Sequence, residues 1–132
     1  MEHCPFCAID AVGLPPHGLL EDEQCFVVLD RESLARGHCM VIPRRHAPSV
    51  SELPASENRH VFDLARWLAP RLARATGTKS VGYVAFGTGL PHAHLHLVPM
   101  DDSSVLLTPR PTLLDDEELA VSARELRHQL AI

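Results

Sequence analysis

Short apolar runs with polar borders occur in the first half of the chain. They cover residues 19–21, 25–29 and 39–42, and the last run ends at Pro43. The acidic residues 21–23 mark a turn between the first two runs, and a polar connection of residues 30–37 separates the second from the third. Apolar runs of this length between turn-forming residues predict β-strands. We therefore expect three strands in this part of the chain.

Residues 54–76 have the apolar spacing of one long helix. Pro54 suits the first helical turn and Gly77 suits the end of the helix. Pro70 falls inside the pattern, where a proline removes a hydrogen-bond donor, so we expect a kink or an unsatisfied carbonyl near it. The predicted apolar face recurs every three or four positions and consists of Val61, Leu64, Ala65, Leu68, Leu72 and Ala75.

The second half of the chain predicts two more strands and a terminal helix. Residues 80–86 and 92–99 predict the strands, and the glycine-rich residues 87–89 form a tight turn between them. A proline-containing linker precedes the terminal helix, for which Asp115 and Glu118 form an N-terminal capping pair. The apolar face of this helix consists of Leu119, Ala123, Leu126 and Leu130. The chain therefore predicts one α+β domain over residues 1–132, an antiparallel sheet with a long helix on one face and a C-terminal helix.

Three histidines alternate with apolar residues in the last predicted strand, at His92, His94 and His96. Side chains two apart on a strand line one face, about 6.5–7 Å from each other. The intervening residues, Ala93 and Leu95, would pack into a core on the other face. Histidine changes charge near neutral pH, and a row of three imidazoles predicts a functional site, although incidental histidines or a tag-like metal-binding patch would give the same pattern.

This stretch resembles the signature of the histidine triad family, His-x-His-x-His followed by apolar residues. The stretch 37–46, which reads Gly-His-Cys-Met-Val-Ile-Pro-Arg-Arg-His, is similar to a second family segment. Family members are nucleotide hydrolases and transferases that act on phosphorus. The resemblance implies a five-stranded sheet with a central helix, paired into a homodimer. It also implies that His94 is the nucleophile, with His96 and His38 binding phosphate oxygens and assisting proton movement.

The resemblance assigns substrate-binding roles to three further residues. Asp30 lies eight positions before His38, where family members place an acidic residue that hydrogen-bonds the ribose hydroxyls. A turn aspartate is the alternative reading of Asp30. Phe6 and Ile9 match the apolar slot for the base, and core packing of the amino-terminal segment explains them equally well.

The turn before the histidines departs from the family pattern. Many members have a Gly-Gln-Ser turn there, whereas this chain has Thr88 and Gly89 in place of the glutamine and the serine. Backbone donors from Gly89 could still bind phosphate. Residues 81–86 lack the asparagine that many members direct at the sugar or phosphate. Arg31 replaces an apolar residue beside the base, where it would face either a larger anionic leaving group or solvent.

Cys4 and Cys7 form a Cys-x-x-Cys pair, a spacing that suits one tetrahedral zinc ion and also a redox pair. Some triad proteins and the related galactose-1-phosphate uridylyltransferases hold zinc with two amino-terminal cysteines and two histidines. By that resemblance His46 and His92 are the remaining ligands, and His3 is an alternative. We expect a closed structural zinc site. The two further cysteines, Cys25 and Cys39, lie in apolar strands and are predicted to be buried thiols.

The composition limits the partners of the chain. Its 132 residues carry a formal net charge of −5, so we expect neither nucleic acid nor an acidic membrane surface as a partner. No apolar run reaches membrane-spanning length, and the first residues lack the features of a signal peptide. We therefore expect a cytoplasmic protein in which the cysteines are reduced or bind metal.

Three function hypotheses follow. The first is a nucleotide hydrolase or nucleotidyl transferase that cleaves at the α-phosphate of a purine nucleotide, of the phosphoramidate or dinucleoside polyphosphate type, through a nucleotidyl-histidine intermediate. The second is a nucleotide-binding regulatory module with little turnover, which the departures at Thr88 and Gly89 motivate. The third is a small metal-binding or redox protein that uses Cys4 and Cys7.

Overall fold

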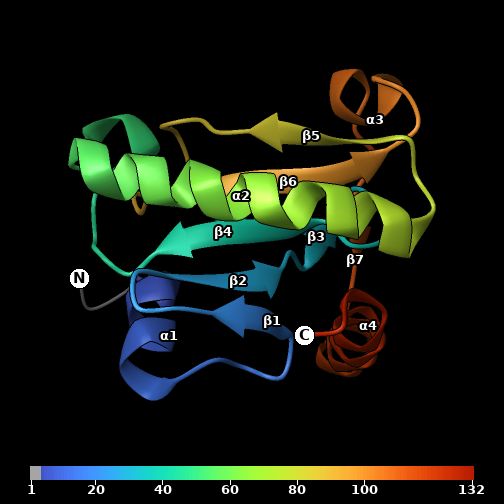
Figure 1. Ribbon diagram of the computed structural model, residues 1–132, viewed down its shortest axis with the longest axis horizontal. Coiled ribbons are helices and arrows are strands. Elements are labelled where there is room, and N and C mark those ends of the chain that lie inside the picture. Colours follow the sequence, from blue (N-terminus) through green and yellow to red (C-terminus); the bar gives the residue numbers. More distant parts are fainter. Residues whose placement is uncertain (1–3) are drawn as a thin grey trace.

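The computed structural model describes residues 4–132, so the alternative ligand His3 lies outside the described residues. Five strands form one antiparallel sheet in the order β1-β2-β4-β6-β5 (Figure 1). The strands are β1 (Gly18–Glu21), β2 (Cys25–Leu29), β4 (Cys39–Pro43), β5 (Ser80–Val84) and β6 (Leu95–Met100). The predicted α+β class with a five-stranded antiparallel sheet is therefore confirmed.

One face of the sheet carries the main hydrophobic core. The long helix α2 (Ala55–Thr76) crosses this face in Figure 1, and α4 (Asp116–Leu130) packs against α2 and β1. Alternate strand residues such as Val27, Val41 and Leu95 point into this core, because successive side chains of a strand face opposite sides. The capping pair predicted for the terminal helix forms, since Asp115 accepts from the Glu118 N–H and Glu118 accepts from the Asp115 N–H.

The helix α2 continues past Pro70 to Thr76 and ends at Gly77 in the left-handed conformation. Pro70 and Arg66, whose carbonyl would otherwise accept the missing N–H, both lie on the exposed side of the helix. Water can therefore satisfy that carbonyl, which explains why the helix tolerates a proline in its interior.

The opposite face of the sheet has a smaller apolar cluster that leaves room for polar side chains. Helix α1 (Pro5–Val12), which the sequence analysis did not predict, covers part of this face. Phe6 from α1 packs there with side chains of β2 and β4 that point away from the main core, namely Phe26, Val28, Met40 and Ile42. The same alternation carries Asp30, His38 and His96 onto this face.

Several boundaries differ from the predictions. The strand expected at residues 92–99 begins only at Leu95, and the strand expected at 80–86 ends at Val84. The polar connection 30–37 contains a short strand, β3 (Glu32–Ser33), which pairs with β7 (Thr112–Leu113) in the expected linker. The same linker holds α3 (Ser104–Leu107), and a 3-10 turn, η1 (Val50–Glu52), precedes α2. Among the described residues, no helix is long and apolar enough to cross a membrane.

Candidate active site

The alternate histidines form a row even though two of them precede the paired part of β6. Ala93, Leu95 and Leu97 are all buried in the main core. The rings of His94 and His96 lie on the other side with centroids 5.0 Å apart. The predicted shared face is therefore present, although residues 92–94 precede the strand ladder, which begins at Leu95.

A backbone carbonyl fixes the tautomer of His94. Its Nδ1 lies 2.7 Å from the carbonyl oxygen of His92. Because a carbonyl oxygen only accepts, Nδ1 carries the proton and the Nε2 lone pair is free. His94 is not part of any cluster of metal-ligating groups in the described chain. A neutral imidazole with a free Nε2 is the form that a nucleophile requires.

His38 and His96 form a directed pair beside His94. The Leu34 N–H donates to Nδ1 of His38 at 3.1 Å, so the proton of neutral His38 is on Nε2. That Nε2 lies 2.9 Å from Nδ1 of His96, which therefore accepts and leaves Nε2–H of His96 as a free donor. The Asp30 carboxylate oxygen Oδ2 lies 3.5 Å from both nitrogens of this contact.

This directed pair also explains why the Asp30, His38 and His96 cluster does not suit a metal ion. Their ligand atoms lie within 4.8 Å of one another. Nδ1 of His38 already accepts the Leu34 N–H, so metal binding through Nε2 would require a ring with no proton on either nitrogen. The cluster is arranged to hold and orient protons. Both ring nitrogens of His38 are therefore already engaged in hydrogen bonds.

Burial keeps this pair uncharged near neutral pH. Desolvation lowers the pKa of His96 to about 4, with further contributions from His38 and His94, although Asp30 opposes the shift. Desolvation also lowers the pKa of His38. The neutral forms therefore predominate near neutral pH, in agreement with the hydrogen-bond directions above.

Cys4, Cys7, His46 and His92 come together at the amino-terminal end of this row, as predicted. Nδ1 of His92 lies 3.3 Å from Sγ of Cys4 and 3.6 Å from Sγ of Cys7, and Nδ1 of His46 lies 3.2 Å from Sγ of Cys7. The two Nδ1 atoms are 3.1 Å apart. All four ligand atoms thus converge on one point.

Local structure explains this convergence. Cys4 is the N-cap of α1, Pro5 occupies the first helical position, and the Cys7 N–H donates to Sγ of Cys4, so both sulfurs lie at the start of the helix. The Pro43 carbonyl, at the end of β4, accepts from Nε2 of His92 at 2.8 Å. Nδ1 of His92 is therefore unprotonated and faces the sulfurs. Desolvation, which lowers the pKa of His92, also favours its neutral form.

Phe6 and Ile9, which were predicted to border the base, lie on the same face of the sheet as the histidines. Phe6 is buried and meets the rings of His92 and His94 edge-on at 5.5 and 5.4 Å, and Ile9 packs at the border of the same cluster. Both the base slot and simple core packing are compatible with these contacts. Gly89 lies in the exposed turn before the histidines with φ of 87°, which favours glycine. Arg31 turns away, toward the Leu114 carbonyl at 3.0 Å and Asp116 at 2.5 Å.

Sequence analysis missed a cavity of about 320 Å³ beside His96. Its lining includes Phe86, whose ring stacks on His96 at 5.7 Å and 10°. The far wall comes from the 101–114 segment. No local pattern marks these residues, because the cavity forms only when that segment folds back over the sheet.

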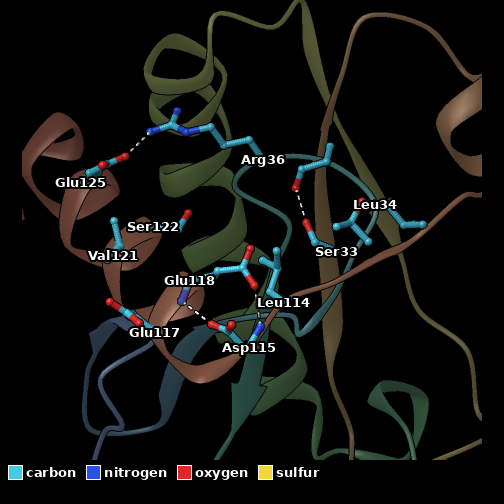
Figure 2. A pocket seen from close by; sticks show the side chains of 12 residues that line it. Ser33, Leu34, Arg36, Leu114, Asp115, Glu117, Glu118, Val121, Ser122 and Glu125 are labelled. Carbon is cyan, nitrogen blue, oxygen red and sulfur yellow. Dashed lines mark hydrogen bonds and ion pairs between the residues drawn. The ribbon is translucent and has the colours of Figure 1, made fainter.

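A larger groove of about 600 Å³ lies between α4 and the 33–36 loop (Figure 2). No histidine or cysteine lines it. Several of its charged side chains are already engaged: Asp115 and Glu118 each accept from the other's backbone N–H, and Arg36 forms an ion pair with Glu125. The groove therefore offers no imidazole or thiol as a nucleophile.

The two other cysteines are buried thiols, as predicted. Burial raises the pKa of both Cys25 and Cys39 to about 12, so neither forms a thiolate readily. Cys25 lies near Asp22 and His60, but Oδ2 of Asp22 is already bonded to Nε2 of His60 at 2.7 Å. This contact joins the β1–β2 turn to α2.

Comparison with known proteins identifies relatives of the chain. A family model described as the HIT domain matches residues 14–103. An adenylylsulfatase from Arabidopsis thaliana is 30% identical over 108 residues, which are 78% of this chain and 55% of that protein. An adenosine 5'-monophosphoramidase from Saccharomyces cerevisiae is 28% identical over 96% of this chain and 82% of its own length. A Zn-bound histidine triad protein from Mycobacterium smegmatis superposes with a TM-score of 0.74 at 26% identity, over 98% of this chain and 94% of its own.

The lowered pKa of His96 predicts a pH-dependent loss of stability. The unfolded chain takes up a proton near its ordinary pKa of 6.5, whereas folded His96 does not until about 4. The stabilisation is therefore complete above about pH 6.5 and is lost as the pH falls toward 4, by up to about 3 kcal/mol. Urea unfolding between about pH 7 and pH 4 measures it. His96→Gln should flatten the curve, whereas His128→Gln on the exposed face of α4 should not; equal slopes for both variants would contradict the prediction.

Proposed function

The chain belongs to the histidine triad family, and we propose that it is a nucleotide hydrolase or nucleotidyl transferase that works through a covalent bond between His94 and the α-phosphate of a purine nucleotide. The single observation that carries this proposal is the free Nε2 of His94, whose other ring nitrogen is held by the His92 carbonyl at 2.7 Å. The similarity to an adenylylsulfatase and to an adenosine 5'-monophosphoramidase supports the same class of reaction.

The reaction would proceed in two displacements. In the first, Nε2 of His94 forms a bond to phosphorus while the bond to the leaving group breaks, and the leaving group takes up a proton that water supplies. The His92 carbonyl accepts a hydrogen bond from Nδ1–H of His94. This hydrogen bond stabilises the positive charge that develops on the ring. In the second, a water oxygen bonds to phosphorus, Nε2 is released, and the surplus proton returns to the solvent.

His96, His38 and Asp30 would position the phosphate and sugar. The free Nε2–H of His96 would donate to a phosphate oxygen, and His38 would hold the His96 ring in that tautomer. Asp30 has one oxygen bonded to the Glu32 N–H and a second oxygen near the histidines, within reach of ribose hydroxyls. Phe6 and Ile9 would border the base, with Gly89 offering a backbone donor.

Replacing His94 tests the reaction. His94→Gln should lower AMP release from adenosine phosphoramidate at least about a thousandfold, because the nucleophile is lost. His128→Gln is the matched control and should retain full activity. Rapid-quench mass spectrometry of the unaltered protein should detect an adduct of AMP mass on His94. Retained nucleotide without an adduct or turnover would instead support a nucleotide-binding regulatory module, the second candidate, which the altered turn at Thr88 and Gly89 favours.

We further propose that Cys4, Cys7, His46 and His92 hold a structural zinc ion. Zinc bonds of about 2.3 Å to sulfur and about 2.0–2.1 Å to nitrogen place tetrahedral ligand atoms about 3.3–3.8 Å apart. The separations of 3.1 to 3.6 Å given above lie within a few tenths of that range. Partial burial and the adjacent Cys4 sulfur raise the pKa of Cys7, so a cation is needed to stabilise two neighbouring thiolates. The Pro43 carbonyl accepts a hydrogen bond from His92 and so fixes the orientation of its ring. Histidines that bind zinc commonly donate their second ring N–H to such an acceptor.

Metal content and thermal stability test the zinc site. The purified protein should contain one zinc per chain, and chelation should lower its melting temperature by at least about 5 °C, since metal binding stabilises only the folded state. Cys7→Ser should lose the zinc, whereas Cys25→Ala should keep it. A metal-free protein with a readily oxidised Cys4–Cys7 pair would favour the redox hypothesis instead.

We also propose a homodimer formed through the β5 edge of the sheet. The outer edge of β5 is unpaired within the described chain, and an unpaired edge is a template for strand pairing. Beside it, Phe62 of α2 and Tyr83 of β5 are exposed with ring centroids 6.5 Å apart. Exposed aromatic side chains of this kind are enriched in interfaces.

Sedimentation equilibrium tests the dimer. The protein should sediment with twice the mass of the chain, and Tyr83→Lys should shift it toward the monomer, because a charge replaces an apolar contact at the interface. Lys79→Glu, at the start of the same edge, is a control for charge alone. A monomer at all concentrations would contradict this proposal and leave the catalytic proposal intact.

A further inference from the structure

A further cavity lies between the carboxyl-terminal ends of α2 and α4. It has a volume of about 410 Å³ and is lined by Arg71, Arg74 and Ala75 of α2 and by Gln129 and Leu130 of α4. Among the described residues, no carboxylate side chain and no residue of the histidine row lines it. The chain as a whole is acidic, with a formal net charge of −5, so this cavity is a local exception. Its positive charge favours an anionic ligand.

The guanidinium of Arg71 is held in place before any ligand binds. Its Cζ lies 4.2 Å from the centroid of the Trp67 ring, and its Nη1 donates to the Trp67 carbonyl at 2.6 Å. The edge formed by Nε and Nη2 has no hydrogen-bond acceptor within the described chain. Such an edge matches two oxygens of a phosphate, and a fixed side chain loses little conformational entropy when it binds.

A hydrogen bond from Arg36 fixes the side-chain amide of Gln129. Nη2 of Arg36 lies 2.8 Å from Oε1 of Gln129. Because a guanidinium only donates, the amide oxygen faces Arg36 and both N–H groups of Nε2 remain available as donors. Arg74 lies one turn after Arg71 and is exposed at the rim of the cavity. Two arginines and one amide thus offer donors to the same space.

The nearby groups that would repel an anion already have partners. Glu125 of α4 lines the larger groove and pairs with Arg36 at 3.8 Å (Figure 2). The carbonyl end of a helix carries partial negative charge, but the Ala75 carbonyl accepts from Nη1 of Arg36 at 3.5 Å. Backbone N–H groups also cap the last carbonyls of both helices. Arg36 therefore compensates the negative charge beside the cavity without lining it.

We propose that this cavity binds a chain of two or more phosphate groups, either free or at the end of a nucleotide. A single phosphate would fill only part of the space and would leave some of the donors unused. Successive phosphates bring charge and acceptor oxygens to Arg71, Arg74 and Gln129 together. Apolar contact comes only from Ala75 and Leu130, so an aliphatic or aromatic ligand would gain little there. The site is independent of the proposed catalytic reaction.

An NMR titration of ¹⁵N-labelled protein tests the site. Tripolyphosphate should shift the Nε–H signal of Arg71 and the side-chain amide signals of Gln129. It should bind at least about tenfold more tightly than inorganic phosphate, because more oxygens reach the donors. AMP, which the proposed catalytic site would bind, should compete at the Gln129 signals no better than inorganic phosphate does. Equal or tighter binding of ATP at these signals would identify a nucleotide as the source, and weaker binding would identify the free chain.

Matched charge removals place the ligand in the cavity. Arg71→Gln and Arg74→Gln should each weaken tripolyphosphate binding at least about fivefold, whereas Arg66→Gln should change it less than about twofold. Arg66 is an exposed arginine of the same helix outside the lining. Trp67→Leu keeps every charge and should also weaken binding, because Arg71 loses its support. Unchanged melting temperatures of the arginine variants confirm that the fold is intact.

Other results would overturn the site. One is the absence of tripolyphosphate binding at millimolar concentration, and another is an equal loss of binding in Arg66→Gln and Arg71→Gln. Tighter binding of a uridine hexamer than of tripolyphosphate, weakened by Arg66→Gln as well, would instead assign this surface of α2 to single-stranded nucleic acid. AMP release by His94 is measured separately and does not depend on any of these results.

Discussion

Hydrogen bonds from the backbone decide what each imidazole of the row is able to do. The Pro43 carbonyl holds the proton of His92 on Nε2, the His92 carbonyl holds that of His94 on Nδ1, and the Leu34 N–H excludes a proton from Nδ1 of His38. Each ring is chemically identical in isolation, and these three contacts give the rings different free nitrogens. Because the backbone groups are parts of β4 and its neighbouring segments, the tautomers depend on the correct register of the sheet.

The sequence predicts the regular elements well, because their patterns are local. The strand at 25–29 and the helix that ends at Thr76 match, and the alternation at His94 and His96 correctly predicts a shared face. The contact between His38 and His96 also follows from two strands lying side by side. Helix α1 was missed because it is short and its packing on the sheet, rather than a long apolar period, stabilises it.

Other parts of the site depend on contacts between distant segments and therefore carry no local signal. The tautomers require knowledge of which carbonyl lies beside which ring. The cavity requires the 101–114 segment to fold back over the sheet, and Phe86 had no distinguishing feature in a strand rich in apolar residues. The carboxyl-terminal segment also supports the loop that contains Asp30, since β7 pairs with β3 and Arg31 binds the Leu114 carbonyl. Family resemblance alone grouped Cys4, Cys7, His46 and His92.

The two faces of the sheet differ in composition and in role. The face beneath α2 and α4 contains most of the buried apolar side chains, whereas the other face carries the ionisable groups and a smaller apolar cluster. Neighbouring positions on one strand, such as Leu97 and Val98, thus belong to different environments. A substitution at the cavity wall therefore changes few contacts of the main core. This arrangement gives the fold room to acquire new specificities by mutation with little loss of folding stability, a property that favours both evolutionary divergence and laboratory redesign.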